Sequence, residues 1–514
     1  MEESMFSHAH YSPKNHHQLN RVSKPLNTLA AVFCIILIGM TSACGPTPEE
    51  LSAFQTVTAM AAFTPTPQPS PTPAGITPDH DLTTILESAA DGDVITLAPG
   101  VFNLTHGLNL DKNLTLIGAG DDQTTITTNT PYSDITTMLM YSGTGTLTFK
   151  GIKIEYAGSD PAAVIYMQSG SLWIEDCILT GATLSASGKQ VGAISMANDA
   201  AAVIRNSQIA GSLNRIDLEN PQKIPGGIFL SGTNKLNLEG SSITDSYIGV
   251  YAYGQAQITI TGSQFSGNYS ALTLLETATA SISGSALSNC SGSCIVTADE
   301  AQVSISDNTF SESPDALAIQ VTENSNAKIL NNKMSDVKSA VIFMDSAAGE
   351  VTGNTIENFT NIGIFLQNTT APMLTNNTLS LGADYFEEAV GISYQDSAAG
   401  EARGNQFTNL FLGISLVGDA APLLDANTFE FCRTGIFYEE NAGGTANANI
   451  IQNGDSGILI NSPASPTITN NTIQANFDGL YSNPEDWIEK LNITGNNITD
   501  GPPEITIVTV TPAK

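Results

Sequence analysis

Two segments of the sequence bring together residue types that suit acid–base chemistry on a sugar. The first spans residues 183–227 and places basic side chains beside carboxylates, in a chain with only 18 Lys and Arg. Its candidates are Lys189, Arg215, Asp217, Glu219 and Lys223. A cation beside carboxylates suits uronate binding and removal of the proton next to the uronate carboxylate. The alternative is a pair of solvated loops with incidental ion pairs.

The second segment, residues 380–390, combines aromatic rings with paired carboxylates. Its members are Asp384, Tyr385, Phe386, Glu387 and Glu388, and the pair Glu439 and Glu440 follows two repeat units later. Aromatic rings near carboxylates suit stacking on a sugar ring and acid–base catalysis. These carboxylates are therefore candidates for catalysis, and Tyr385 and Phe386 are candidates for substrate binding.

An apolar stripe is expected on one outward-facing sheet. Its members are Tyr251, Ile295, Ile342, Phe365, Phe437, Leu459 and Tyr481. An exposed apolar patch of this extent usually marks a contact surface. We expect Tyr251, Phe365, Phe437 and Tyr481 to contact substrate, and the alternative is that an insertion or the linker packs over the stripe.

Acidic residues recur at one turn of the repeat, where a metal ion is one explanation. They are Glu276, Asp299, Glu300, Glu323, Asp345, Asp396, Asp419 and Glu440. Like charges on neighbouring turns repel, and Ca²⁺, which takes several carboxylate oxygens, would relieve that repulsion. The alternative is a solvated edge screened by salt.

The cysteines allow one disulfide. Cys290 and Cys294 are close enough in sequence to bond across a turn, although Cys294 as a buried thiol is an equal alternative. Two further cysteines, Cys177 and Cys432, lie in the part of the chain that follows Cys44.

Charge and histidine content exclude two classes of partner. The 514-residue chain carries a formal charge of −32, which repels phosphate backbones, so nucleic acid is not an expected partner. Four of the six His residues precede Cys44, which leaves no His cluster for copper or zinc. We expect a monomer.

The first residues form an export signal. Basic residues precede an apolar run from Leu29 to Met40, and small residues then lead to Cys44. This arrangement resembles the lipobox of bacterial lipoproteins, which implies lipidation of Cys44, although Thr41 stands where that family usually has Leu. We assign residues 1–43 to a signal peptide and 44–78 to a tether, because its Pro/Thr-rich part favours an extended spacer. The protein is then a membrane-anchored lipoprotein at the cell surface or in the periplasm.

The remaining chain is organised by a repeat of about 22 residues. Its anchor is an Asn or Ser followed two residues later by an apolar residue, at positions Ser241, Ser263, Ser285, Asn308, Asn332, Asn354, Asn377, Asn405, Asn427, Asn449, Asn471 and Asn496. Apolar columns lie three residues before the anchor, two after it and about nine after it. Short alternating segments separated by Asn, Gly and Ser are strands. Three strands per repeat predict an all-β, right-handed parallel β-helix, in which stacked Asn amides form a structural ladder.

The boundaries of this β-helix follow from the same pattern. It covers residues 79–510, with an N-terminal cap at 79–92, long insertions at 183–227 and regular repeats at 238–500. The cap contains a short amphipathic helix that begins after Asp81 and ends before Gly92.

The segments GDVITLAPGVF (92–102) and LTLIGAG (114–120), followed by NNTI-type units, resemble the pectin-lyase-like superfamily over residues 79–510. The repeats are similar to β-helices of carbohydrate-binding and sugar-hydrolysing proteins and of a periplasmic copper-maturation family. The catalytic motifs of polygalacturonases, pectate lyases and pectin methylesterases are absent or incomplete. The resemblance therefore implies the fold more than an activity. We expect a protein that binds extracellular or cell-surface polysaccharide. One form of this expectation is that the protein also processes the polysaccharide. The alternatives are a non-catalytic scaffold or adhesin, and an atypical lyase or hydrolase.

Overall fold

The computed structural model describes residues 75–132, 136–183, 192–210, 226–382 and 388–501. The predicted sites at Cys44, Lys189, Arg215, Asp217, Glu219, Lys223, Asp384, Tyr385, Phe386 and Glu387 lie outside these ranges. Among the described residues, no helix is long and apolar enough to cross a membrane.

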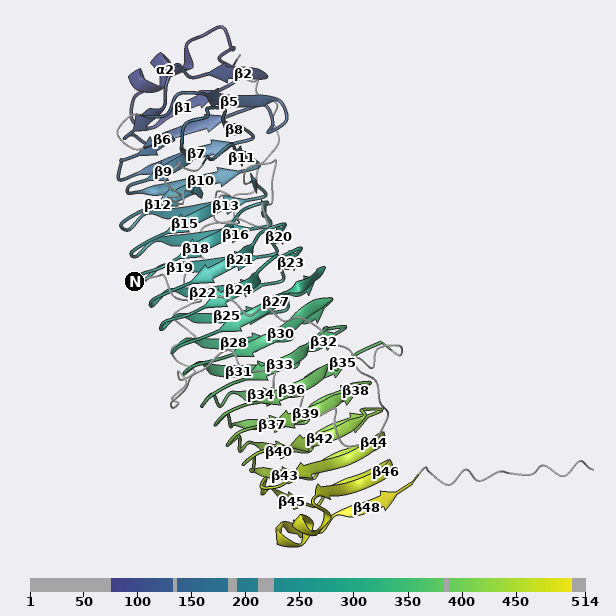
Figure 1. Ribbon diagram of the computed structural model, residues 1–514. Coiled ribbons are helices and arrows are strands. Elements are labelled where there is room, and N and C mark those ends of the chain that lie inside the picture. Colours follow the sequence, from purple (N-terminus) through teal and green to yellow (C-terminus); the bar gives the residue numbers. More distant parts are fainter. Residues whose placement is uncertain (1–74, 133–135, 184–191, 211–225, 383–387, 502–514) are drawn as a thin grey trace, which may run out of the picture. The chain divides into compact units, whose positions relative to one another are not determined.

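Each repeat is one coil of three short strands. One such coil consists of β16 (Lys235–Glu239), β17 (Ser242–Thr244) and β18 (Ile248–Ala252), and the next begins with β19 (Gln257–Thr261). Every strand pairs in parallel with its counterpart one coil away, as β16 does with β19 and β18 with β21 (Ser270–Leu274). The coils stack from β1 (Asp93–Thr96) to β48 (Asn497–Asp500), as Figure 1 shows. The first strand of most coils belongs to a 17-stranded sheet. The fold is a parallel β-helix, as predicted.

The apolar columns of the repeat form the core inside the coils. Strand β19 alternates exposed and buried residues, with Ile258 and Ile260 pointing inward. Phe310 and Phe407 are buried in the column two residues after the anchor, and the rings of Phe407 and Phe429 stack with centroids 4.6 Å apart. Burying one such side chain stabilises a protein by about 1.5–3 kcal/mol. In a solenoid these side chains pack against the neighbouring coils, so each coil is stabilised mainly by stacking on its neighbours.

The anchor residues form the predicted ladder, and it is buried. The Asn405 side chain accepts from the Asn377 backbone N–H at 3.0 Å and from Asn377 Nδ2 at 3.0 Å. It donates through Nδ2 to Leu374 O at 2.9 Å and to Asn427 Oδ1 at 3.0 Å. The same pattern continues to Asn496. The Ser anchors also accept from the backbone N–H of the preceding anchor, as Ser285 Oγ does from Ser263, but the Ser263 hydroxyl donates to Thr261 O in its own coil. The ladder therefore satisfies backbone groups that the turn between two strands would otherwise leave unpaired.

The N-terminal end carries the expected helix. Helix α2 (Leu82–Ser88) begins after Asp81, whose carboxylate accepts from the backbone N–H groups of Thr83 and Thr84. Leu82 and Leu86 are buried against the core. The C-terminal end carries a 3₁₀ helix, η4 (Glu485–Lys490), where Trp487 donates its ring N–H to Ala464 O at 2.7 Å.

One predicted member of the outward-facing apolar stripe is wrong. Ile295, expected to face outward, is buried on β24 (Ser293–Thr297), where it pairs with Leu272 and Ile319. Ile295 follows its anchor, Ser285, by ten residues, whereas Leu272 follows Ser263 by nine. The corner before β24 therefore holds an extra residue, and Val296 takes the outward position.

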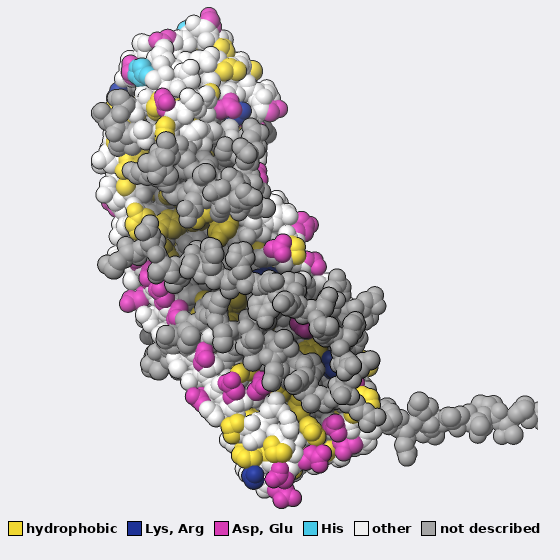
Figure 2. Space-filling view, viewed as in Figure 1, with side chains coloured by type: hydrophobic (Ala, Val, Ile, Leu, Met, Phe, Trp, Pro, Cys, Tyr) yellow, Lys and Arg dark blue, Asp and Glu magenta, His cyan; other side chains and the backbone are white. Residues whose placement is uncertain are grey.

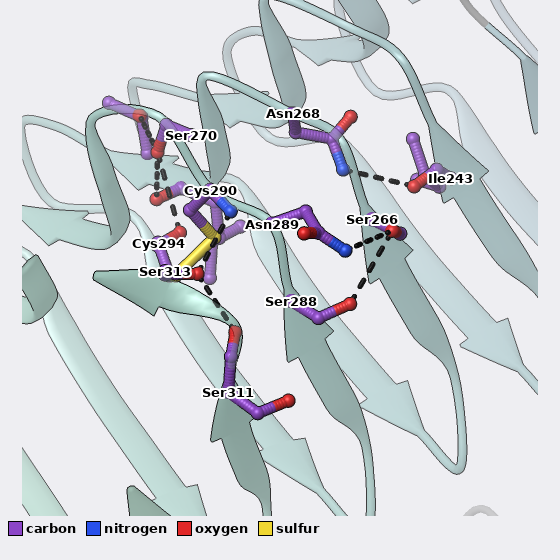
Figure 3. Close-up of a disulfide and its surroundings, with 12 residues drawn as sticks. Ile243, Ser266, Asn268, Ser270, Ser288, Asn289, Cys290, Cys294, Ser311 and Ser313 are labelled. Carbon is purple, nitrogen blue, oxygen red and sulfur yellow. Dashed lines mark hydrogen bonds between the residues drawn. A yellow bond between two sulfur atoms is a disulfide. The ribbon is translucent and has the colours of Figure 1, made fainter. Parts of the chain in front are cut away.

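That corner contains the disulfide between Cys290 and Cys294 (Figure 3). The Cys290 backbone N–H donates to Ser313 Oγ at 3.0 Å, and Ser313 Oγ donates in turn to Ser311 O at 2.9 Å. The disulfide thus fixes the longer corner to its own coil, and the hydrogen bond to the Ser313 hydroxyl fixes it to the next coil. Cys177 and Cys432 are free and buried.

Candidate functional site

Among the described carboxylate candidates, the structure separates Glu388 from Glu439 and Glu440. Glu388 precedes β36 (Val390–Tyr394), whereas Glu439 and Glu440 follow β42 (Thr434–Tyr438), two coils further on. In the register of these strands Glu439 is level with Gln395, which lies five residues after Val390. Five extended residues span about 16 Å. Glu388 and Glu439 therefore lie at opposite ends of the strands and do not flank one bond. Burial, followed by repulsion from Glu440, raises the pKa of Glu439.

The outward column of the predicted stripe divides into two parts. Phe365 on β33 (Ile362–Leu366) and Phe437 on β42 are 7% and 3% exposed. Tyr251 on β18 and Tyr481 on β46 (Thr472–Asn483) are half-buried. All four positions point out of the core, but only Tyr251 and Tyr481 present appreciable surface.

The outer face of β15 (Gly226–Leu230) and β18 carries a cluster of three aromatic rings, Phe229, Tyr251 and Tyr253. Phe229 and Tyr251 are partners in the strand register, and their ring centroids are 5.6 Å apart. The rings of Tyr251 and Tyr253 are 5.8 Å apart, and Tyr253 is 40% exposed. We call these three residues the aromatic cluster.

A glycine permits the position of one of these rings. A Cβ on Gly226 would lie 2.2 Å from Cε1 of Phe229, closer than any real contact. The Phe229 ring therefore lies over the start of its own strand and adds to the apolar surface beside Tyr251. Phe229 and Tyr253 were absent from the sequence prediction. The insertion at 211–225 interrupts the repeat before Phe229, and Tyr253 stands just outside the strand, where turn residues are expected.

The acidic edge begins at Glu276, one coil beyond the aromatic cluster. Burial raises the pKa of Tyr251 most, and Tyr253, Glu276 and Asp299 raise it further. The Tyr251 hydroxyl therefore stays protonated and can donate a hydrogen bond. The site thus combines apolar ring surface with nearby carboxylate acceptors, the two features that bind the faces and hydroxyls of a sugar.

The predicted acidic edge has a structural role in its first coils. The backbone N–H of Glu276 donates to Asp299 Oδ2 at 2.7 Å, and that of Asp299 donates to Glu323 Oε2 at 2.8 Å. The N–H of Glu323 donates likewise to Asp345 Oδ2 at 3.2 Å. These residues have positive φ, so their N–H groups point along the stack rather than into a strand.

Within the described ranges, no group of three or more His, Cys, Asp or Glu side chains is placed to hold a metal ion. Calcium binding along the acidic edge therefore stays a prediction, and the described residues do not supply a set of ligands for it. The residues concerned are Asp299, Glu323, Asp345, Asp396, Asp419 and Glu440. Figure 2 shows acidic side chains more often than basic ones on the face in view.

A model of the right-handed β-helix region matches the chain in overlapping segments, residues 137–274, 192–313, 226–379, 270–411 and 362–509. Together these segments run through most of the coils described above. The chain belongs to the right-handed β-helix family. A search of curated proteins finds no match to this β-helix.

Solved structures similar to this β-helix include several enzymes that act on polysaccharides. The periplasmic alginate epimerase AlgG is 12% identical, with coverage of 82% of this chain and 83% of that chain and a TM-score of 0.36. A mannuronic acid specific polysaccharide family 6 lyase from human gut microbiota is 10% identical, with coverage of 84% and 91% and a TM-score of 0.39. An alginate lyase from Paenibacillus sp. str. FPU-7 is 17% identical, with coverage of 58% and 97% and a TM-score of 0.34. Similarity at this level does not assign an activity.

Proposed function

We propose that this β-helix protein is exported, anchored by a lipid on Cys44, and binds extracellular or cell-surface polysaccharide at the aromatic cluster. The observation that carries the proposal is the set of three neighbouring rings on the outer face of β15 and β18. Solvent-facing rings on a sheet lose contact with water when a flat, partly apolar ligand covers them. Sugar rings have such faces, and their hydroxyls suit the carboxylates of the acidic edge, which begins one coil further on at Glu276.

The geometry of the coils supports a polymer as the ligand. Neighbouring coils are about 4.8 Å apart, so successive side chains on one column recur at a spacing close to that of sugar units. Phe229 and Tyr251 occupy the same column in neighbouring coils. A polysaccharide lying along the stack would therefore meet one ring per coil at this site.

The test is isothermal titration of the protein with a panel of neutral and acidic glycans, followed by variants against each glycan that binds. Tyr251→Ala should weaken binding about tenfold, because it removes the central ring. Phe477→Ala is the matched control, since Phe477 is an aromatic residue 67% exposed on β46, remote in the coil order. Equal affinities for wild type and Tyr251→Ala would refute the site.

A non-catalytic scaffold or adhesin is the second candidate, and one observation favours it. The described members of the predicted carboxylate pairs are Glu388, Glu439 and Glu440, and Glu388 lies at the opposite end of the strands from the other two. An atypical lyase or hydrolase is the third candidate. Incubation with each bound glycan, followed by chromatography of the products, separates them: shortened or unsaturated products indicate an enzyme, and intact polymer indicates a binding protein.

The lipid anchor has its own test. Cys44→Ser should move the protein from membrane fractions to the soluble fraction and abolish labelling by a fatty acid. Retention of both properties in the variant would refute lipidation at Cys44.

A further inference from the structure

The 17-stranded sheet carries a cavity of about 540 Å³ on its outer side, lined in part by the turns that follow β15 and β18. Three consecutive coils line it, each with two residues from the turn and the start of the following strand. The lining residues are Asp199, Ala201, Thr233, Lys235, Gln255 and Gln257. This volume is within the range of small-molecule sites, about 300–1,000 Å³.

Ala201 creates the hollow beside Lys235. In the register of β13 (Ala201–Arg205), β16 and β19, Ala201, Lys235 and Gln257 are direct neighbours in one outward column. The methyl group of Ala201 is the smallest of the three side chains, so the ammonium of Lys235 has open space on that side. Gln257 borders it on the other side with an amide.

Lys235 differs from the other cations of this sheet in having no carboxylate partner. The sheet's strands, all within the described residues, carry five cations, and four of them form ion pairs. Lys150 pairs with Glu175 at 2.6 Å, Arg205 with Glu239 at 2.8 Å, Lys328 with Glu350 at 3.5 Å, and Arg403 with Glu401 and Asp425. No ion pair within 4.0 Å involves Lys235 in this part of the chain. An exposed cation without a carboxylate partner, in a chain of charge −32, is available to an anionic ligand.

The acidic edge stops at this cavity. In the later coils, the turn position three residues before the strand of the 17-stranded sheet is acidic. It holds Glu276, Asp299, Glu323 and Asp345. In the three coils of the cavity the same position holds Asn198, Gly232 and Gly254, also with positive φ. A Cβ on Gly254 would lie 2.8 Å from the Gly232 backbone nitrogen, so these turns stack backbone on backbone. The acidic edge therefore does not reach the turns beside Lys235, and Asp199 is the one acidic residue among those that line the cavity.

We propose that this cavity binds an acidic sugar unit, with its carboxylate on the Lys235 ammonium. The amides of Gln255 and Gln257 then donate to and accept from the sugar hydroxyls, and the Asp199 carboxylate accepts from a hydroxyl. The site shares no residue with the aromatic cluster, although Tyr253 and Gln255 lie on the same turn, and the proposal does not depend on polysaccharide binding at the cluster.

The test is titration of the full chain with oligogalacturonate and with glucuronate. A neutral oligosaccharide and acetate serve as ligand controls at matched ionic strength. Lys235→Gln should weaken uronate binding about tenfold, the low end for a hydrogen bond to a charged group. Ala201→Leu, which fills the cavity without changing charge, should weaken it at least as much. Lys328→Gln removes one positive charge from the same sheet and should change affinity less than twofold.

Four results would each overturn the proposal: no uronate binding to the folded wild type, equal binding of acetate, unchanged affinity in Ala201→Leu, or equal losses in Lys235→Gln and Lys328→Gln. Tyr251→Ala should leave uronate affinity unchanged, which separates failure of this site from failure of the aromatic cluster.

Discussion

Replacing Asn405 by alanine removes one rung from the middle of the buried Asn ladder. Asn405 is fully buried, and its side chain makes four hydrogen bonds to three residues. We expect Asn405→Ala to destabilise the β-helix strongly, even though the alanine side chain fits the space without a clash.

The magnitude follows from the groups that lose partners. Asn377 Nδ2 still donates to Val351 O, and Asn427 Oδ1 still accepts from the Asn405 backbone N–H. The Asn377 backbone N–H and Leu374 O lose the Asn405 side chain altogether. A buried polar group left unpaired costs about 1–3 kcal/mol, so the expected loss is about 2–6 kcal/mol. Asn405→Ser should cost about half as much, because a serine hydroxyl can accept from the backbone N–H of the preceding anchor, as Ser285 Oγ does from Ser263.

The assay is denaturant unfolding combined with hydrogen exchange. Gln406→Ala is the matched control, because Gln406 is the next residue and is exposed. In a solenoid the loss should appear first as faster exchange in the coils around Asn377 and Asn427, since each coil contacts mainly its neighbours. If Asn405→Ala unfolds at the same denaturant concentration as Gln406→Ala, the ladder does not stabilise the fold and the reasoning is wrong.

Three further predictions concern the core and the charges. Phe407→Ala should cost about 3–5 kcal/mol in unfolding free energy, against little change for Phe477→Ala, because only the first leaves a cavity in the core. Cys177 and Cys432 should resist alkylation at pH 8 until the protein is denatured; burial raises the pKa of these thiols to about 11 and about 12, and labelling of the native protein would contradict that burial. Glu323→Gln should raise the Tm at neutral pH, because burial and the neighbouring acids raise the pKa of Glu323, so that its charged form opposes folding. The gain should fade as the pH falls towards about 4, where the carboxyl is protonated; the same gain at every pH would exclude charge as the cause.

The repeat was readable from the sequence because one coil is about 22 residues long and each coil needs the same side chains at the same places. A buried turn needs an amide or hydroxyl in every coil, and the inward strand positions need apolar residues. Asn405 and Phe407 were therefore placed correctly from spacing alone. The spacing failed at Ile295, where an extra residue in the corner before β24 shifts the strand by one position and so reverses the face of each side chain.

The sequence by itself determined the stacking of coils, the buried ladder and the helix at the N-terminal end, because these depend on local spacing and on contacts between equivalent residues. Only the tertiary structure decided which side chains of different coils share a surface. Ala201 and Lys235 are 34 residues apart in sequence, on either side of residues 211–225, yet they are neighbours in one column, and Phe229 is aligned with Tyr251 in the first coil after that segment. Their meeting depends on the lengths of the corners between strands, which the period of the repeat does not fix, and on the size of side chains one coil away.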